Sequence, residues 1–214
     1  MDNLKFSALL CSRLCHDLAS PVGAINNGVE MLETETDPAL VSQIIGLIEQ
    51  SAAQTTNRLQ YYRLAFGAAG GLGSEIGLDY AKTTMKAFFG DQKIKLEFDP
   101  GQRTGSPAVV KLLMNLALTA SETIIRGGKL VIEIEDQAAG RRFALRAEAD
   151  KIKVRDTIAE ALAGRLAADD LDSKSIPAAL AAEIARTLGT SVTVADQSDG
   201  RFSLGVDVPA AGLG

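Results

Sequence analysis

Apolar residues repeat every seven positions through the first third of this 214-residue chain. Such spacing puts the repeating side chains on one stripe of an α-helix, and it therefore predicts two long amphipathic helices. In the first helix the two rows are Leu4, Cys11, Leu18, Ile25 and Leu32, and Ala8, Cys15, Val22 and Val29. In the second they are Val41, Ile48, Thr55 and Tyr62, and Ile45, Ala52, Leu59 and Phe66. Each helix should be about 40–45 Å long.

The short polar turn TETDP separates the two helices. Asp37 suits the N-cap of the second helix and Pro38 suits its first turn, so the two helices should form an antiparallel hairpin. A lone hairpin buries too little apolar surface to be stable. We therefore expect a homodimer, in which two copies form a four-helix bundle across a two-fold axis.

A glycine-rich stretch at residues 67–77 (GAAGGLGSEIG) predicts a linker between two domains, residues 1–70 and 75–214. The second domain alternates predicted helices with strands that look antiparallel in part, which indicates an α/β two-layer sandwich. The predicted helices are 78–89, 106–125, 155–168 and 177–188. The predicted strands are 93–98, 130–135, 142–147, 190–195 and 202–208, with a last turn at Asp199 and Gly200.

The charge and composition exclude several classes of function. The net charge is −5 and no basic block stands out, so we expect neither a nucleic-acid nor a membrane partner. No stretch reaches the roughly 20 apolar residues of a membrane span, and the first residues do not resemble a signal peptide, which favours a cytoplasmic protein. The two cysteines, Cys11 and Cys15, fall on the apolar stripe, and we expect buried thiols there rather than a disulfide or a metal site.

His16 is the only histidine of the chain. At 100° per residue it lies about 120° from the centre of the apolar stripe, so its imidazole should face solvent. Four small or polar residues share that side of the helix. They are Ser12, Ser20, Gly23 and Asn27. On position alone, an exposed histidine on a helix is most often an ordinary polar surface residue.

The residues around His16 favour a chemical role. A neutral imidazole nitrogen is a good nucleophile that takes a phosphoryl group from an acyl phosphate and passes it on. Asp17 follows His16 directly. Neighbours in sequence do not face each other on a helix, so Asp17 need not contact the His16 ring. The negative charge of Asp17 would still favour a proton on one ring nitrogen. Pro21 removes the backbone hydrogen bond to the Asp17 carbonyl.

The string HDLASP at residues 16–21 resembles the H box of sensor histidine kinases, and the domain after it resembles the kinase ATP-binding domain in its order of elements. The longer string LCSRLCHDLASPVGAINNG is similar to the histidine phosphotransferases of Alphaproteobacteria, and this resemblance extends over nearly the whole chain. It implies a dimeric hairpin with His16 as the phosphorylated residue and Asp17 beside it.

The sequence departs from the kinases where they bind nucleotide. Counting back from Gly127 and Gly128, the kinase Mg²⁺-binding Asn falls on Thr119 and the usual nearby Lys falls on Glu122, while Asn115 matches a residue that is not the metal ligand. The loops EADKIKVRD and SKSIPAALAAE contain no glycine, so their backbone cannot approach phosphates closely. We therefore expect no ATP binding, no autokinase activity and no bound cofactor.

The resemblance also implies the partners. The chain would accept phosphoryl on His16 from the receiver aspartate of a hybrid histidine kinase and pass it to response regulators, with Mg²⁺ held by the receiver. The implied docking residues are Ser12, Arg13, Ser20, Gly23 and Asn27. Two alternatives remain: a non-catalytic adaptor that binds receivers or kinases, and an active histidine kinase with an unusual nucleotide site.

Overall fold

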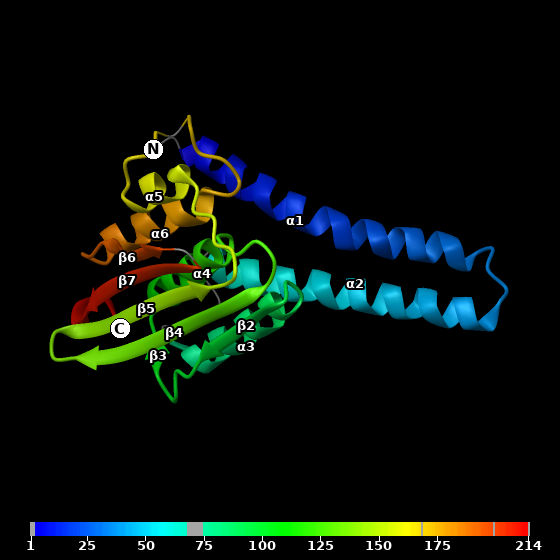
Figure 1. Cartoon of the computed structure of the whole chain (residues 1–214), viewed down its shortest axis with the longest axis horizontal. Helices are drawn as coiled ribbons and strands as arrows, with labels where there is room; N and C mark the ends of the chain where they lie inside the picture. Colours follow the sequence, from blue (N-terminus) through cyan, green and yellow to red (C-terminus); the bar gives the residue numbers. More distant parts are fainter. Residues whose placement is uncertain (1–2, 68–74, 168, 199, 214) are drawn as a thin grey trace.

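A computed structural model describes residues 3–67, 75–167, 169–198 and 200–213 (Figure 1). Most of the predicted linker at residues 67–77, and Asp199 of the predicted last turn, lie outside the described residues. No helix within the described ranges is long and apolar enough to cross a membrane.

The chain begins with a long helical hairpin, as the apolar rows predict. Its helices are α1 (Asn3–Leu32) and α2 (Pro38–Ala65), which project together from the rest of the molecule (Figure 1). Asp37 is the N-cap of α2, and its carboxylate accepts a hydrogen bond from the Ala39 backbone N–H at 2.8 Å. Pro38 opens the helix, where no intrahelical donor is needed.

The remainder of the chain forms a sheet with helices on one face (Figure 1). Its elements are β1 (Ile76–Gly77), α3 (Leu78–Gly90), β2 (Ile94–Phe98), β3 (Thr104–Gly105), α4 (Pro107–Ser121), β4 (Gly128–Gln137), β5 (Gly140–Glu148), α5 (Asp156–Leu162), α6 (Ile176–Thr187), β6 (Val192–Ser198), β7 (Arg201–Pro209) and η1 (Ala210–Gly212). The five-stranded sheet has the order β2-β4-β5-β7-β6; only the β2–β4 pair is parallel. The predicted combination of a helical hairpin with an α/β two-layer sandwich is confirmed.

Strand alternation explains which face of the sheet the helices cover. Phe143 pairs with Ile134 on one side and with Val206 on the other, and Phe143 and Val206 are each 1% exposed. On the opposite face, charged residues form ion pairs, such as Lys129 with Glu97 at 2.8 Å. A sheet with one apolar and one charged face needs helices on one side only.

The structure differs from the sequence predictions at several short segments, including the helix predicted at 106–125, which ends at Ser121 as α4. The helix predicted at 155–168 ends at Leu162 as α5, because Gly164 takes a left-handed backbone conformation (φ +67°) that stops the helix. The two-residue strands β1 and β3 pair with each other and are missed by the sequence, because two residues are too few to show a periodic pattern.

The base of the hairpin shares its core with the sheet and its helices. Tyr61 of α2 is fully buried, stacks on Phe88 at 4.1 Å between ring centroids, and donates a hydrogen bond to the Met114 carbonyl at 2.7 Å. The Asn115 amide donates to the Ala65 carbonyl at 2.8 Å. These contacts fix α2 against α3 and α4.

One of the two apolar rows stays uncovered in the single chain. Val22 and Val29 of α1 are each 49% exposed, and Leu59 of α2 is 47% exposed. The prediction that Cys11 and Cys15 are buried is wrong for the single chain, since both are exposed. The reason is that the apolar stripe of each helix is wider than the surface that the other helix of the hairpin buries.

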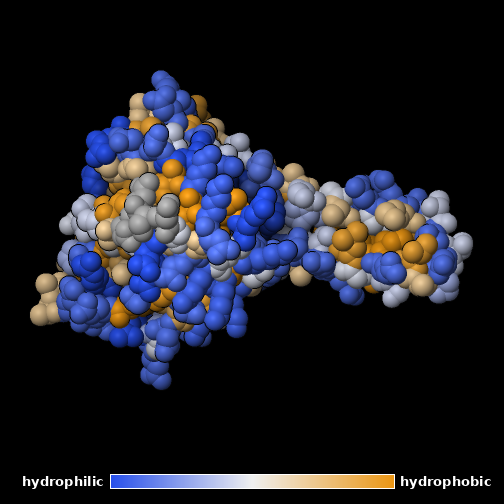
Figure 2. Space-filling view, in the orientation of Figure 1, coloured by the Kyte–Doolittle hydropathy of each residue, from blue (hydrophilic) through white to orange (hydrophobic). Residues whose placement is uncertain are grey.

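Further apolar surface lies at the projecting end of the hairpin (Figure 2). There Met31, Leu40 and Leu47 are 52%, 44% and 46% exposed and surround a shallow hollow. These three residues do not belong to the seven-residue rows.

Candidate functional site

His16 lies midway along α1 and its side chain is 77% exposed, which confirms the predicted orientation. Ser12, Ser20 and Asn27 are also exposed on α1. Gly23 is half-buried, and a Cβ atom added to it would meet no atom within 4 Å. The imidazole therefore projects from a convex surface bordered by small side chains.

Asp17 contacts the imidazole directly. The distance from His16 Nδ1 to Asp17 Oδ1 is 2.9 Å, although the helical spacing did not require contact between these neighbours. The spacing rule describes where Cβ atoms point, whereas a flexible ring turns its Nδ1 back toward the adjacent carboxylate. The charge of Asp17 therefore acts on the ring through a hydrogen bond.

The second oxygen of Asp17 is held from two helices. It accepts a hydrogen bond from Arg13 Nε of α1 at 2.6 Å and another from the Tyr62 hydroxyl of α2. Burial acts to raise the pKa of Asp17, but the Arg13 guanidinium and the hydrogen bonds to the carboxylate outweigh it and hold the pKa below its ordinary value. An ionised carboxylate can only accept, so His16 Nδ1 carries the proton, and in the neutral ring Nε2 therefore holds the lone pair.

The backbone of Asp17 is also held. Pro21 lies inside α1 and has no N–H to donate to the Asp17 carbonyl. Arg58 of α2 donates to this carbonyl instead. The backbone hydrogen bond that the sequence predicts to be missing in α1 is thus replaced by a donor from α2.

Arg13 does not belong to the exposed surface that the sequence predicts for docking. It is 8% exposed, and its Nη1 pairs with Glu122 at the end of α4 and donates to the Ser173 carbonyl at 2.9 Å. The expected exposure of Arg13 is therefore wrong, while its role in docking stays a prediction. The sequence does not reveal that α4 and the loop before α6 pack against this side of α1.

Sequence reasoning missed three residues of this site: Arg58, Tyr62 and Glu122. Tyr62 was counted only as a member of an apolar row, and nothing near Arg58 marks it as the partner of a proline-interrupted helix. Glu122 did carry a signal, since an acid stands where kinases have a lysine, but the sequence does not show that Arg13 is its partner.

The polar residues of α4 hold the structure together. Asn115 donates to the Ala65 and Lys111 carbonyls, both at 2.8 Å. The Thr119 hydroxyl donates to the Asn115 carbonyl at 2.8 Å and is buried. Within the described ranges, no three His, Cys, Asp or Glu side chains are grouped to hold a metal ion.

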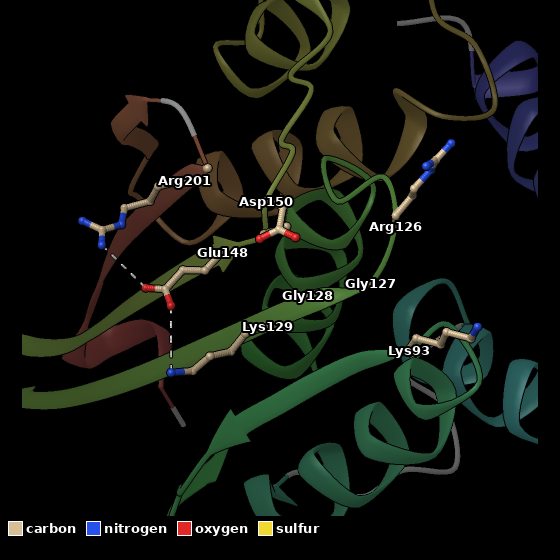
Figure 3. A pocket seen from close by; sticks show the side chains of 10 residues that line it. Lys93, Arg126, Gly127, Gly128, Lys129, Glu148, Asp150 and Arg201 are labelled. Carbon is tan, nitrogen blue, oxygen red and sulfur yellow. Dashed lines mark ion pairs between the residues drawn. The ribbon is translucent and has the colours of Figure 1, made fainter.

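The cavities nearby are separate from the exposed ring. One of about 900 Å³ lies where β4 and β7 begin and β5 ends, and there Glu148 pairs with Lys129 and Arg201, each at 3.9 Å (Figure 3). The hairpin contributes no residue to it. A smaller one of about 210 Å³ lies behind the site, lined in part by Asp17 and Arg58. His16 lines neither, so its surroundings suit a macromolecular partner better than a small substrate.

Known proteins similar to this chain indicate its family. Residues 78–200 match the family model of the histidine phosphotransferase C-terminal domain. Protein phosphotransferase ChpT of Brucella abortus (strain 2308) is 32% identical over 191 residues, which are 89% of this chain and 90% of that protein.

A solved structure described as a bacterial phosphotransferase superposes on this chain with a TM-score of 0.84 and 29% identity, covering 97% of this chain and 98% of the other. The Acinetobacter baumannii histidine kinase AdeS aligns over 91% of this chain and 98% of its own at a TM-score of 0.47 and 13% identity, which is much weaker. The match to the family model and the identity to ChpT show that this chain belongs to the histidine phosphotransferase family and acts as a protein phosphotransferase.

Proposed function

We propose that His16 carries the phosphoryl group, accepting it from the receiver aspartate of a hybrid histidine kinase and passing it to response regulators. The observation that carries this proposal is the exposed imidazole whose Nδ1 is held by Asp17 and whose Nε2 is free. His16 is also the only histidine in the chain. Because its partners would be receiver domains, we infer a cytoplasmic location.

The transfer step follows from the tautomer. The Nε2 lone pair attacks phosphorus of the receiver's aspartyl phosphate, the new bond is N–P, and the P–O bond to the aspartate breaks and leaves a carboxylate. No proton has to leave, because Nδ1 keeps its own and the ring becomes a phosphoimidazolium. Asp17 stabilises this positive ring through the same hydrogen bond. The reverse step returns the phosphoryl group to another receiver.

The partner would supply Mg²⁺, and this chain would supply the docking surface. Ser12, Ser20 and Asn27 are exposed beside His16, and the open space at Gly23 leaves room for another chain. With small side chains around the ring, a receiver's phosphorylated aspartate could approach Nε2 without obstruction. We propose no cofactor for this chain itself.

We further propose that the chain neither binds ATP nor phosphorylates itself. Thr119 uses its hydroxyl within α4, and Glu122 pairs with Arg13, so neither residue is available for a metal–nucleotide complex. Calorimetric titration with Mg-ATP should give no saturable binding. A dissociation constant below about 100 μM, which corresponds to about −5.5 kcal/mol, would contradict this and favour an active kinase.

The functional unit that we propose is a homodimer. The uncovered row of α1 and α2, which includes Val22, Val29, Ile45 and Leu59, forms one apolar face of the hairpin. Covering it with the same face of a second copy would complete a four-helix bundle. On α1 this row lies about 120° from His16, so dimerisation would leave the imidazole exposed.

The test is incubation with a receiver domain phosphorylated on its aspartate. The wild-type chain should acquire a label that is stable to base and labile to acid, and His16→Ala should acquire none while unfolding at the same temperature. A labelled alanine variant would contradict the proposal. An unlabelled wild-type chain that still binds the receiver would favour the adaptor.

A further inference from the structure

The α/β part of the molecule contacts the phosphotransfer site at Arg13, through the Glu122 side chain and the Ser173 backbone carbonyl. Glu122 follows the last residue of α4, and its Oε1 pairs with Arg13 Nη1, while Arg13 Nε donates to Asp17 at 2.6 Å. Asp17 in turn holds His16 Nδ1 at 2.9 Å. A continuous chain of charged contacts therefore runs from the end of α4 to the imidazole.

We propose that Glu122 is a positioning residue for phosphotransfer, acting through Arg13 and Asp17 to keep His16 in the tautomer whose Nε2 is free. This inference rests on the proposed function of His16. It gives the α/β domain a task that needs no nucleotide.

The arrangement of charges explains how Glu122 would act. Arg13 is 8% exposed and its guanidinium lies between two carboxylates, so Glu122 balances part of its charge and fixes its orientation. Without that partner, more of the guanidinium charge would act on Asp17, which would then be a poorer acceptor for the imidazole N–H. Only Asp17 and the Ser173 carbonyl would be left to fix the orientation of Arg13.

The position of Glu122 is unfavourable for the fold itself. Burial raises its pKa above the ordinary value, although Arg13 acts in the opposite direction, and its Oε2 is buried without a hydrogen-bond partner. It also stands at the C-terminus of α4, where the helix dipole disfavours negative charge. An acidic residue at a position where it destabilises the fold is typical of a functional site.

Other charged groups surround Glu122 and are unchanged in the experiment below. They are Asp17 of α1, Lys174 of the loop before α6, and Lys153, Arg155 and Asp172 around a cavity that Glu122 also lines. Because the pKa of Glu122 is raised, the folded chain binds this proton more tightly than the unfolded chain. Stability is therefore lost as pH rises through the raised pKa, and a neutral side chain avoids that loss.

The first measurement uses the single histidine. The ¹⁵N resonances of one imidazole report its tautomer directly and without overlap, and no partner protein is needed. In the wild-type chain the neutral ring should be mainly protonated at Nδ1. In Glu122→Gln the population should move toward the Nε2–H form, and Glu122→Met provides the same test should the glutamine variant fail to fold.

The second measurement is the rate of transfer from a phosphorylated receiver. Glu122→Gln should transfer about tenfold more slowly, with an unfolding temperature at pH 8 no lower than that of the wild-type chain. Glu160→Gln is the matched control, because it removes an acid that pairs with Arg165 at 2.9 Å on the surface of the same domain. The control should change neither tautomer nor rate.

Three results would overturn the proposal. They are a tautomer and rate within twofold of the wild type, a slower rate with an unchanged tautomer, and a slower rate that is matched by a lower unfolding temperature. Failure of the proposed function is a different observation, namely the absence of any label on the wild-type chain. The tautomer measurement tests Glu122 in either case.

Discussion

At the scale of single residues, the site depends on the hydrogen bonds that the Asp17 carboxylate accepts. Asp17 accepts from Arg13, from Tyr62 and from the His16 ring, and its two oxygens divide these tasks. One oxygen is anchored by residues that do not react, so the other faces the imidazole in a fixed direction. Preorganisation of this kind lowers the cost of reaching the reactive geometry.

Tyr62→Phe tests this anchoring. The variant loses the hydroxyl that donates to Asp17, while its ring can still stack on Phe66, with 5.1 Å between ring centroids. A hydrogen bond to a charged group is worth about 1.5–3 kcal/mol, so the free energy of unfolding at pH 7 should fall by roughly that amount. Transfer from a receiver should also slow.

The same variant should change how stability depends on pH. The lowered pKa of Asp17 means that its ionised form stabilises the fold above the unfolded-state pKa of about 3.9, and that this stability is lost as pH falls through the lowered pKa. Urea unfolding of Tyr62→Phe should therefore differ from the wild type at pH 7 and much less near pH 2. An equal difference at both pH values would contradict this account.

At the scale of elements, the hairpin is predictable because its helices are long and periodic. The rows of apolar residues place α1 and α2 within one or two residues, and Asp37 with Pro38 marks the start of α2. Short or irregular segments carry no such pattern: β1 and β3 were missed, and the helix predicted at 155–168 was too long.

The pairing of Pro21 with Arg58 is an element-scale prediction. Arg58→Leu should leave the Asp17 carbonyl without its donor and lower the free energy of unfolding by about 1–3 kcal/mol. Pro21→Ala restores a backbone N–H at the position that a regular helix would use. The double variant should therefore lose less stability than the sum of the two single changes, as measured by urea unfolding, and strict additivity would contradict the pairing.

At the scale of the whole molecule, the sequence indicates the residues that we propose to react, but not the residues that hold them. His16 and Asp17 are adjacent and belong to a recognisable string, so one segment suffices to find them. Tyr62 and Glu122 lie 45 and 105 positions further along than Asp17. The pairing of α1 with α2 brings Tyr62 to Asp17, and the packing of the hairpin against α4 brings Glu122 to Arg13. The same packing buries Arg13, which the sequence placed on the surface.

The proposed dimer makes a prediction about assembly. Val22→Glu and Leu59→Glu each place a charge on the uncovered apolar row and should give monomers in light scattering at micromolar concentration. Met31→Glu is the matched control: it is equally exposed and apolar but lies off the rows, and it should stay dimeric. A monomeric wild-type chain would contradict the proposal.

The central claim is that the free nitrogen of a single imidazole carries the phosphoryl group while its neighbour stays bonded to Asp17. The most direct measurement is an NMR spectrum of the ¹⁵N-labelled chain after phosphorylation by a receiver, in which coupling to ³¹P identifies the modified nitrogen. The account predicts phosphorus on Nε2 of His16, with a proton on Nδ1. Phosphorus on Nδ1, or on any other residue, would contradict it.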